Sequence, residues 1–498
     1  MQDKLTDGQG PKAALGLFDA TSIIVGIVIG SGIYKTAPLI FSNVVQPWQA
    51  LLVWGLGGVL SLIGALCYAE LATAYPRSGG DYVYLTRAFG SWMGFLFGWA
   101  QLAVVLTASI GMMAYIFAEY GARLLGWSQY QEVHVLLAVA AVTVLTVFNT
   151  LGVVLGKWTQ NILTLAKVLG LGGIVLVGFL WGRPEVLAEP VSVPAGATAN
   201  LGLAMILVMY TYGGWNDAAF VAAEVRKQRR NIPLSLILGL LGITAIYLAV
   251  NAAYLAALGF EGARQAKEIA ADVLALRLGE YAGKAMCVLV MISALGAING
   301  MIFTGARVYS SLGSEHRLFA GLGTWHRRWQ TPLWSLVVQW GLTVVLILGV
   351  GTAPGQSILD KFLMSIGLSP IPWDKYGGGF DTLLAASAPV FWSFFLLTGL
   401  AVFVLRERDS EVPRPFRVPL YPLLPLIFCG NCFFMLYSAV NYAGTLSVIL
   451  GLVPVAVGLP LWWISQALQT TSRSVPGLAV STDHIASAGQ QLPTGRHV

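Results

Sequence analysis

Residues 22–41 read SIIVGIVIGSGIYKTAPLIF and residues 203–222 read LAMILVMYTYGGWNDAAFVA, so each is an apolar stretch interrupted by glycine. A helix that spans a bilayer must satisfy its own backbone N–H and C=O groups, because the hydrocarbon core contains no water. Gly-Ser-Gly at 30–32 and Gly-Gly at 213–214 weaken that ladder near the centre of each stretch. Paired breaks of this kind indicate a transporter, because the freed backbone groups line a binding site.

The composition places the whole chain in a membrane. The 498 residues are 56% hydrophobic and 10% charged, whereas about 25% of residues are charged in a typical soluble domain. Apolar runs recur along the chain, each long enough to cross a hydrocarbon core of ~30 Å. The sequence therefore predicts an all-α polytopic membrane protein with twelve transmembrane helices, at about 14–43, 47–74, 91–122, 132–152, 160–182, 200–224, 233–259, 283–311, 332–350, 383–405, 420–443 and 446–467.

The chain divides into three parts on the same grounds. Residues 1–12 are polar and predict a cytoplasmic N-terminal segment, and residues 13–469 hold all the spans. Residues 470–498, rich in Ser, Thr, Gly and Gln, predict a disordered cytoplasmic tail. We expect the protein in the plasma membrane or the inner membrane of a cell.

The basic residues predict the orientation. With the N-terminus inside, the inward loops hold most of the Lys and Arg, for example RKQRR at 226–230 and the four arginines between 406 and 417. A positive-inside bias puts both termini in the cytoplasm. The net charge of +6 is then a topology signal beside anionic lipid, and no nucleic-acid partner is expected.

The breaks carry their own chemistry. A helix that restarts at residues 30–32 exposes free N–H groups and a partial positive charge, which suit a carboxylate. The half-helices that end before each break expose carbonyl groups with the opposite charge. A zwitterion with carboxylate and ammonium on one carbon, an α-amino acid, satisfies both sets. The alternative is that these glycines only allow close helix packing.

Four motifs then resemble the L-type amino acid transporter branch of the amino acid–polyamine–organocation superfamily. They are IVIGSGIY at 27–34, PRSGGDYVYLTRAFG at 76–90, YTYGGWNDAAFVAAEVRKQRRNIP at 210–233 and PRPFRVPLYPLLP at 413–425. The resemblance runs over about 12–465 and implies a LeuT-like fold. Two inverted five-helix repeats, at about 13–182 and 200–405, would bring the broken helices 1 and 6 face to face, with peripheral helices at about 420–467.

The resemblance also implies where the substrate carboxylate binds. The first break provides Gly30 and the N–H groups of Ser31, Gly32 and Ile33. No metal or other cofactor is implied.

For the ammonium group, the resemblance implies the carbonyls of Val28, Tyr210 and Gly213. The Tyr210 ring would cap the pocket and help to set the size of the substrate side chain. Gly214 completes the second break, and Asn216 follows it closely enough to line the same pocket.

Lys167 is a second functional candidate. It lies in LTLAKVLGLGGIVLVGF with no acidic residue within a turn, and a lysine at mid-span costs ~2.5–3.5 kcal/mol on insertion scales. Snorkelling to the membrane surface is the alternative, since we place Lys167 seven to ten residues from the cytoplasmic end of its span. In sodium-independent relatives a lysine on this helix replaces the sodium ion, so we expect no sodium requirement and a brace on the first broken helix.

Three further residues are weaker candidates. Tyr247 matches a family position near the first broken helix. Asp217 is the acid nearest to the pocket, and Glu261 matches an outer-gate position in some relatives.

The cysteines predict packing and the absence of a partner. Cys67, Cys287, Cys429 and Cys432 all lie within predicted spans, and no outer loop contains a cysteine. We therefore expect no disulfide-linked heavy-chain partner, unlike the heteromeric animal members of the family. An outer segment at 351–382 is longer than the family pattern, and it either lies on the membrane or caps the outer vestibule.

The function that follows is sodium-independent exchange of L-amino acids by alternating access. Neutral substrates are favoured because VIGSGI and MYTYGGWN contain no carboxylate. Proton-coupled symport, exchange of cationic amino acids or polyamines, and an amino acid sensor remain alternatives. An enzyme is not expected, because the histidines are scattered over loops and the tail without metal-ligand spacing: His134, His316, His326, His484 and His497.

Overall fold

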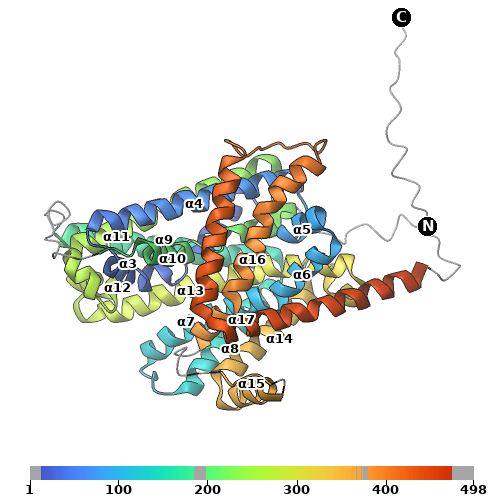
Figure 1. The fold of residues 1–498 in the computed structure, drawn as a ribbon. Helices are drawn as coiled ribbons and strands as arrows, with labels where there is room; N and C mark the ends of the chain where they lie inside the picture. The colour runs from blue at the N-terminus through green and yellow to red at the C-terminus, as the bar shows by residue number, and fades with distance from the viewer. Residues whose placement is uncertain (1–12, 184–197, 366, 372, 374–378, 474–498) are drawn as a thin grey trace, which may run out of the picture.

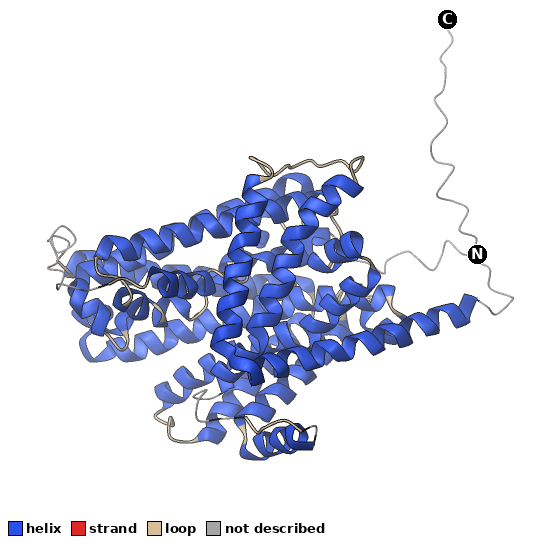
Figure 2. Ribbon diagram, in the orientation of Figure 1, coloured by secondary structure: helices blue, strands red, loops and turns tan. Residues whose placement is uncertain are grey.

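The computed structural model describes residues 13–183, 198–365, 367–371, 373 and 379–473. The predicted N-terminal segment and nearly all of the predicted tail lie outside these residues. The described chain consists of helices joined by loops (Figure 2), and its single β-type contact is an isolated bridge between Leu15 and Val225. The predicted all-α class is confirmed.

The first part of the chain forms five spans with one extra helix in a loop. The elements are α1 (Leu17–Val28), α2 (Gly32–Lys35), α3 (Ala37–Ser42), α4 (Pro47–Ala74), α5 (Asp81–Phe89), α6 (Ser91–Ala100), the π-helix η1 (Gln101–Val105), α7 (Leu106–Leu125), α8 (Gln131–Thr150) and α9 (Val153–Trp181). The extra helix, α5, occupies the PRSGGDYVYLTRAFG motif.

The second part begins with another broken segment. The elements are α10 (Leu201–Thr211), the 3-10 helix η3 (Trp215–Glu224), α11 (Gln228–Gln265), α12 (Ile269–Leu278), η4 (Gly279–Tyr281), α13 (Ala282–Glu315), η5 (Arg317–Gly323), α14 (Leu333–Gly351), α15 (Ala353–Ser365), α16 (Gly379–Arg408) and α17 (Leu423–Arg473). Gly444, with φ 67°, divides α17 into two helices.

Eleven helices of the described chain have the length and apolarity to cross a membrane, against twelve predicted spans. The predicted span at 200–224 is missing from this set, because its two pieces, α10 and η3, have only 11 and 10 residues. The exact count of twelve is therefore not established. The outer segment at 351–382 contains α15, which the sequence did not predict as a helix.

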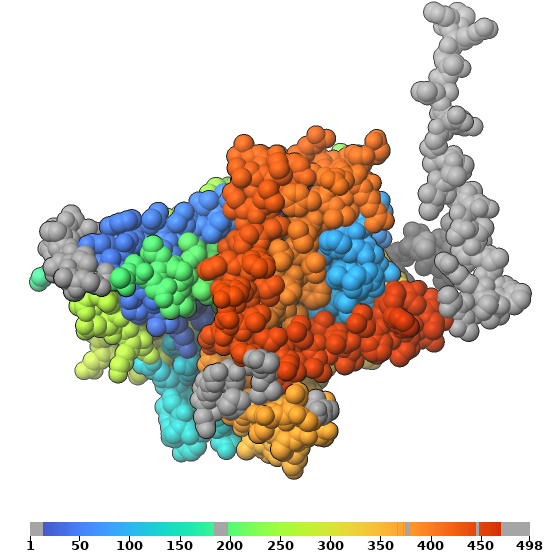
Figure 3. All heavy atoms as spheres, viewed as in Figure 1, coloured from blue at the N-terminus to red at the C-terminus, as the bar shows by residue number. Residues whose placement is uncertain are grey.

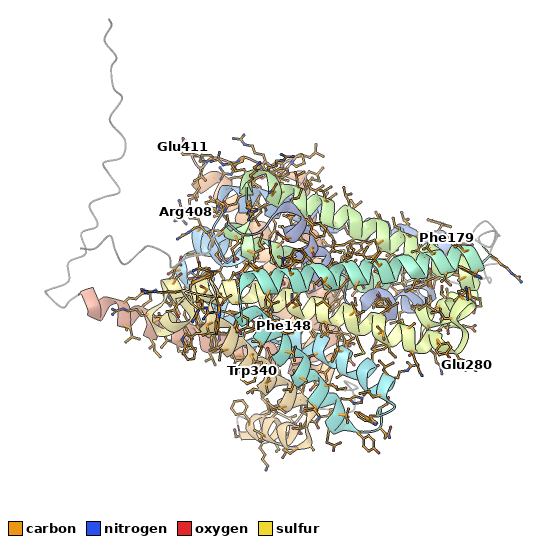
Figure 4. The ribbon with its side chains drawn as sticks, turned by 180° about the vertical axis from the view of Figure 1, so that it is seen from behind. Phe148, Phe179, Glu280, Trp340, Arg408 and Glu411 are labelled. Atoms are coloured by element: carbon orange, nitrogen blue, oxygen red, sulfur yellow. The ribbon has the colours of Figure 1, made fainter. Side chains whose placement is uncertain are left out.

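The long helices α4, α11, α9 and α13 lie side by side, and α16 with the first half of α17 crosses them (Figure 1). The second half of α17 packs along α6, where the Trp99 indole donates to the Pro454 carbonyl at 2.7 Å, and its end extends beyond the body of the molecule (Figure 3). Phe179, near the end of α9, and Glu280, just before α13, lie at one edge of the molecule, whereas Arg408 and Glu411 lie at the opposite edge (Figure 4). Alternate loops therefore share an edge.

Glycines let the neighbouring helices approach α1. A Cβ on Gly239 of α11 would lie 3.0 Å from the Ile24 side chain, and one on Gly300 of α13 would lie 2.4 Å from that of Ile27. Small residues at such contacts are how membrane helices pack closely. The first broken helix is therefore held between α9, α11 and α13.

Candidate functional site

The first break leaves a row of free backbone donors. Helix α1 ends at Val28, the Gly30 N–H donates back to the Val28 carbonyl at 2.8 Å, and α2 begins at Gly32. In the described chain no acceptor meets the N–H groups of Ser31, Gly32 and Ile33. Ile33 is fully buried and Ser31 nearly so. Three consecutive free donors in a dry environment are the groups that an anion needs for binding.

The carbonyl side of the same break is occupied by fixed donors. The Lys167 ammonium donates to the carbonyls of Gly26 and Ile29, both at 2.7 Å, and to that of Ser293 at 3.0 Å. The Ser293 hydroxyl lies within hydrogen-bonding distance of the Ile29 and Gly30 carbonyls, at 2.9 and 3.0 Å. Lys167 therefore joins α9 to α1 and α13 through backbone carbonyls alone.

Lys167 cannot reach the membrane surface. Helix α9 begins at Val153, so Lys167 is the fifteenth of its 29 residues, and its side chain is fully buried. The helix starts at Val153, before the predicted span start at residue 160, so Lys167 lies further from the helix start than the predicted seven to ten residues. The polar segment LGKWTQN at 155–161 lowers the local hydropathy, so the predicted span began after the helix does. The snorkelling alternative is excluded by this geometry.

The second break depends on a left-handed glycine. Helix α10 ends at Thr211, the Gly213 N–H donates to the Tyr210 carbonyl at 3.2 Å, and Gly214 has φ 99° before η3 begins. That conformation disfavours any residue with a Cβ. A Cβ on Gly214 would also lie 2.6 Å from Ile27 Cγ2, so the two breaks are in contact.

Tyr247 joins the two breaks. Its hydroxyl lies 3.1 Å from the Val28 carbonyl and 3.2 Å from the Thr211 carbonyl. On the other side, a Cβ on Gly32 would lie 2.8 Å from Thr211 Cγ2. The free N–H groups of the first break therefore lie beside the end of α10.

The predicted carbonyl acceptors are not equally available. The Val28 carbonyl already accepts from the Gly30 N–H, and the single proton of the Tyr247 hydroxyl goes either to it or to the Thr211 carbonyl. The Tyr210 carbonyl accepts from the N–H groups of Tyr212 and Gly213, and the Gly213 carbonyl meets no donor within the described residues. The Gly213 carbonyl is therefore the acceptor most open to a ligand.

The side chains around the second break differ in exposure. Tyr210 is 39% exposed, and its side chain lies near Asp381 and Tyr442. Asn216 is buried, and its Oδ1 meets no donor in the described chain. Asn216 therefore has a free acceptor next to the break, whereas Trp215 packs against Tyr68.

Of the remaining predicted residues, Asp217 is 6% exposed and faces another acid, Asp81. Glu261 is exposed and bonds Arg264 and Gln265 of its own helix, so the structure does not bring it to the breaks. All four cysteines are free and buried, and no group of side chains in the described chain forms a metal-binding cluster.

The sequence-based prediction did not include two residues that contact the breaks. Ser293 lies in MISALGAING and Thr211 lies in the second break itself. A lone hydroxyl in a small-residue run carries no signal for function, because serine and threonine commonly bond their own helix. Only the fold places both hydroxyls at the breaks.

At the opposite end of α1, backbone hydrogen bonds join a residue just before the helix to the end of η3. The Leu15 N–H donates to the Glu224 carbonyl at 2.9 Å, and the Arg226 N–H donates to the Leu15 carbonyl at 2.8 Å. The Glu224 carboxylate is buried against the Arg307 guanidinium at 2.7 Å. These contacts join the start of α1 to the end of η3 and to α13.

Two broken helices in contact, with free donors on one and open acceptors on the other, define a membrane transporter built on paired helix breaks. The comparisons with known proteins agree with this class. Residues 15–463 match the model of the amino acid permease family, and the chain belongs to that family.

The similar proteins are amino acid transporters and exchangers. The serine/threonine exchanger SteT of Bacillus subtilis is 29% identical over 464 residues, which are 92% of this chain and 98% of SteT. The human b(0,+)-type amino acid transporter 1 is 29% identical, over 84% of this chain and 82% of its own length. The human cystine/glutamate transporter is 27% identical, over 91% and 85%.

Proposed function

We propose that this protein is a sodium-independent exchanger of L-amino acids that works by alternating access. The observation that carries the proposal is the row of free N–H groups at Ser31, Gly32 and Ile33, beside the carbonyl of Tyr210 and the open carbonyl of Gly213. A carboxylate satisfies the first set and an ammonium satisfies the second. Gly30 and Gly214 allow the backbone to approach the ligand, and Val28 joins the acceptors only when Tyr247 moves away.

Sodium independence is supported by Lys167. A fixed ammonium already binds the carbonyls of Gly26, Ile29 and Ser293, so these oxygens are not available to a sodium ion. The lysine ammonium then takes the place of the ion at these carbonyls.

Neutral substrates are supported by the side chains at the breaks, which present hydroxyl, amide and aromatic groups. Asn216 offers a free amide oxygen and Tyr210 a partly exposed ring. Exchange is supported by SteT, which carries it in its name. Proton-coupled symport and exchange of cationic amino acids or polyamines remain the alternatives, and an amino acid sensor is the remote one.

We further propose that both termini lie in the cytoplasm. The contacts that join Leu15 to Glu224 and Arg226, which we call the inner gate, would close the cytoplasmic side. The basic loop around Arg226 lies at this end of η3, as a positive-inside bias requires. The absence of cysteines from the outer loops supports a carrier that works without a disulfide-linked heavy chain.

The test is transport by the purified protein in liposomes with a panel of labelled L-amino acids. Uptake that requires internal amino acid indicates exchange, and uptake driven by a pH gradient indicates symport. The sodium dependence is measured in the same vesicles. A protein that moves none of the panel contradicts the proposal.

The site assignment is tested by Gly32→Val. Its side chain would enter the space of Thr211 Cγ2 and cover the free N–H groups, so we expect uptake to fall to background in folded protein. Gly172→Val is the matched control, because a Cβ at Gly172 meets nothing within 4 Å. Normal uptake by Gly32→Val contradicts the assignment.

A further inference from the structure

The short helix α15 presents large apolar side chains on the surface of the protein. It has 13 residues and lies between the end of α14 at Gly351 and the start of α16 at Gly379, at the rim of the molecule (Figure 1). Ile358, Phe362 and Met364 are 67, 55 and 54% exposed. A helix of this length is too short to cross a bilayer, but it can lie along the membrane interface.

The opposite face of α15 is packed against the protein. Leu363 is 3% exposed and packs with Ile371 and with residues of α16 and α17. Leu359 packs against a second cluster, whose residues come from α7, α14 and α16. Because this face is already occupied, Ile358 and Phe362 cannot turn inward without exposing Leu363.

Hydrogen bonds hold α15 in this orientation. The Asp360 carboxylate accepts from the Ile371 N–H and from the Trp373 indole N–H, both at 3.0 Å. Near the start of the helix, the Gln356 side chain donates to the Val350 carbonyl of α14 at 2.8 Å. The exposed apolar side chains are therefore a fixed feature of the surface.

The apolar side of α15 continues the lipid-facing surface of α14. A Cβ on Gly355 would lie 2.3 Å from the carbonyl oxygen of Leu348, which is 42% exposed, and Val345 one turn earlier is 63% exposed. The spacing of Gly355, Ile358 and Phe362 puts all three on one side of α15. Because α14 has the length and apolarity of a membrane span, its exposed apolar surface faces acyl chains, and the same environment extends to Ile358 and Phe362.

The adjoining side of α15 is polar. Ser357 and Lys361 are both exposed, and they lie one turn apart beside the apolar pair. A helix in the membrane interface is divided in this way, with its apolar side among the acyl chains and its charged side among the headgroups. The long lysine side chain can keep its ammonium group in water.

A cap over the outer vestibule, the other position expected for this segment, has less support. The two clusters against which Leu359 and Leu363 pack contain residues of α7, α14, α16, α17 and the loop after α15. Within these clusters of described residues, none comes from α1, α2 or α10, which form the two breaks. The packed face of α15 is therefore directed at the periphery of the protein.

We propose that α15 is an interfacial helix, in which Ile358 and Phe362 insert among lipid acyl chains at the membrane surface where α14 ends. Lys361 then lies among the headgroups. In the orientation proposed above, this is the outer surface. The helix would anchor the adjoining ends of α14 and α16 to the lipid, whichever substrate the protein carries.

The test is the environment of a fluorophore attached to Phe362→Cys in the full-length protein. The label is the environment-sensitive dye NBD. The vesicles are phosphatidylcholine, with part of the lipid carrying a nitroxide quencher either close to the headgroup or at the end of the acyl chain. Lys361→Cys, one residue away, is the matched control. The native cysteines are buried, and wild-type protein labelled in parallel gives the background.

We expect the shallow nitroxide to quench the label at Phe362→Cys at least threefold more than the label at Lys361→Cys. The deep nitroxide should quench it less, because the apolar face of an interfacial helix lies only ~5–10 Å into the boundary between headgroups and acyl chains. Iodide in the water should quench the label at Lys361→Cys more strongly.

Three results would overturn the inference. One is equal quenching of the two labels by the shallow nitroxide. Another is strong iodide quenching at Phe362→Cys that saturating amino acid relieves, which would identify a vestibule cap. The third is a label that neither nitroxide nor iodide quenches, which would identify a protein contact such as a second copy of this chain.

Ile358→Cys repeats the measurement on the same side of the helix, and it decides alone if Phe362→Cys is not monodisperse after purification. The readout requires no transport. A lipid-quenched label with no uptake in the liposome panel would therefore contradict the proposed function and leave the interfacial helix standing. Normal uptake with a label that lipid does not quench would do the reverse.

Discussion

The two broken helices differ in what occupies their backbone groups. At the first break the carbonyls are held by Lys167 and Ser293, and only the N–H groups are free. At the second break the turn depends on Gly214, and the polar side chains that follow it, Asn216 and Asp217, lack a donor or a cation. Side chains therefore hold the carbonyls of the first break in place, whereas polar side chains at the second break lack partners.

This difference suggests a division of work. A braced row of donors is already arranged for a ligand, so binding costs little reorganisation. Unsatisfied groups on η3 gain partners when ligand, water or a proton arrives, so their state can follow the transport cycle. The first break would bind the carboxylate that all amino acids share. The second break would change its conformation when a ligand binds.

Replacing Lys167 should have the largest effect, because it removes the brace. Lys167→Met leaves the Gly26 carbonyl without its donor, and an unsatisfied buried group costs ~1–3 kcal/mol. We expect uptake to fall more than ~100-fold and the melting temperature in detergent to fall by several degrees.

Lys157→Met is the control, since Lys157 is on the same helix but pairs with partly exposed Asp19. Uptake by Lys167→Met within threefold of the wild type would mean that the first break needs no brace.

The two breaks also differ in how far the sequence predicts them. Helix interruption follows from glycine in an apolar run, and the family motifs place Ser31–Ile33 and Tyr210–Gly213 in the right elements. A lone lysine in a span is conspicuous because of its insertion cost. The broken-helix fold and the candidate donors could therefore be predicted.

The partners of these groups could not be predicted. Ser293 is more than 100 residues from Lys167 along the chain, and nothing in its local sequence marks it. Asp81 lies in a polar loop motif, yet the side chain is buried and bonded to Tyr68. Local patterns report the energy of one segment, whereas these contacts depend on which segments pack together.

Gly214→Ala should have an intermediate effect, because it strains the second break without removing a polar group. The left-handed conformation costs an alanine ~1–2 kcal/mol, and the methyl group would meet Ile27 Cγ2. We expect a ~10-fold fall in uptake with folded protein retained.

The control is Gly126→Ala, which has a similar φ of 74° but no neighbour within 4 Å of the added Cβ. It carries the same backbone strain away from the site. An equal loss of uptake in both variants would assign the effect to general instability and not to the contact between the breaks.

Tyr247→Phe should have the smallest effect, and it tests the group that joins the two breaks. The variant removes one hydroxyl that serves the Val28 and Thr211 carbonyls, and a typical hydrogen bond contributes ~1 kcal/mol. The loss also frees a lone pair of Val28 for the substrate ammonium. We therefore expect a melting temperature lower by a few degrees but a KM for amino acid that is unchanged or up to fivefold lower.

Tyr254→Phe is the matched control on the same helix, because its hydroxyl contacts the Ile33 carbonyl only weakly, at 3.5 Å. It should lower stability less and leave KM unchanged. If Tyr247→Phe instead raises KM, the Tyr247 hydroxyl orders the site for substrate. The Val28 carbonyl would then be a structural acceptor, and the ammonium would depend on the second break alone.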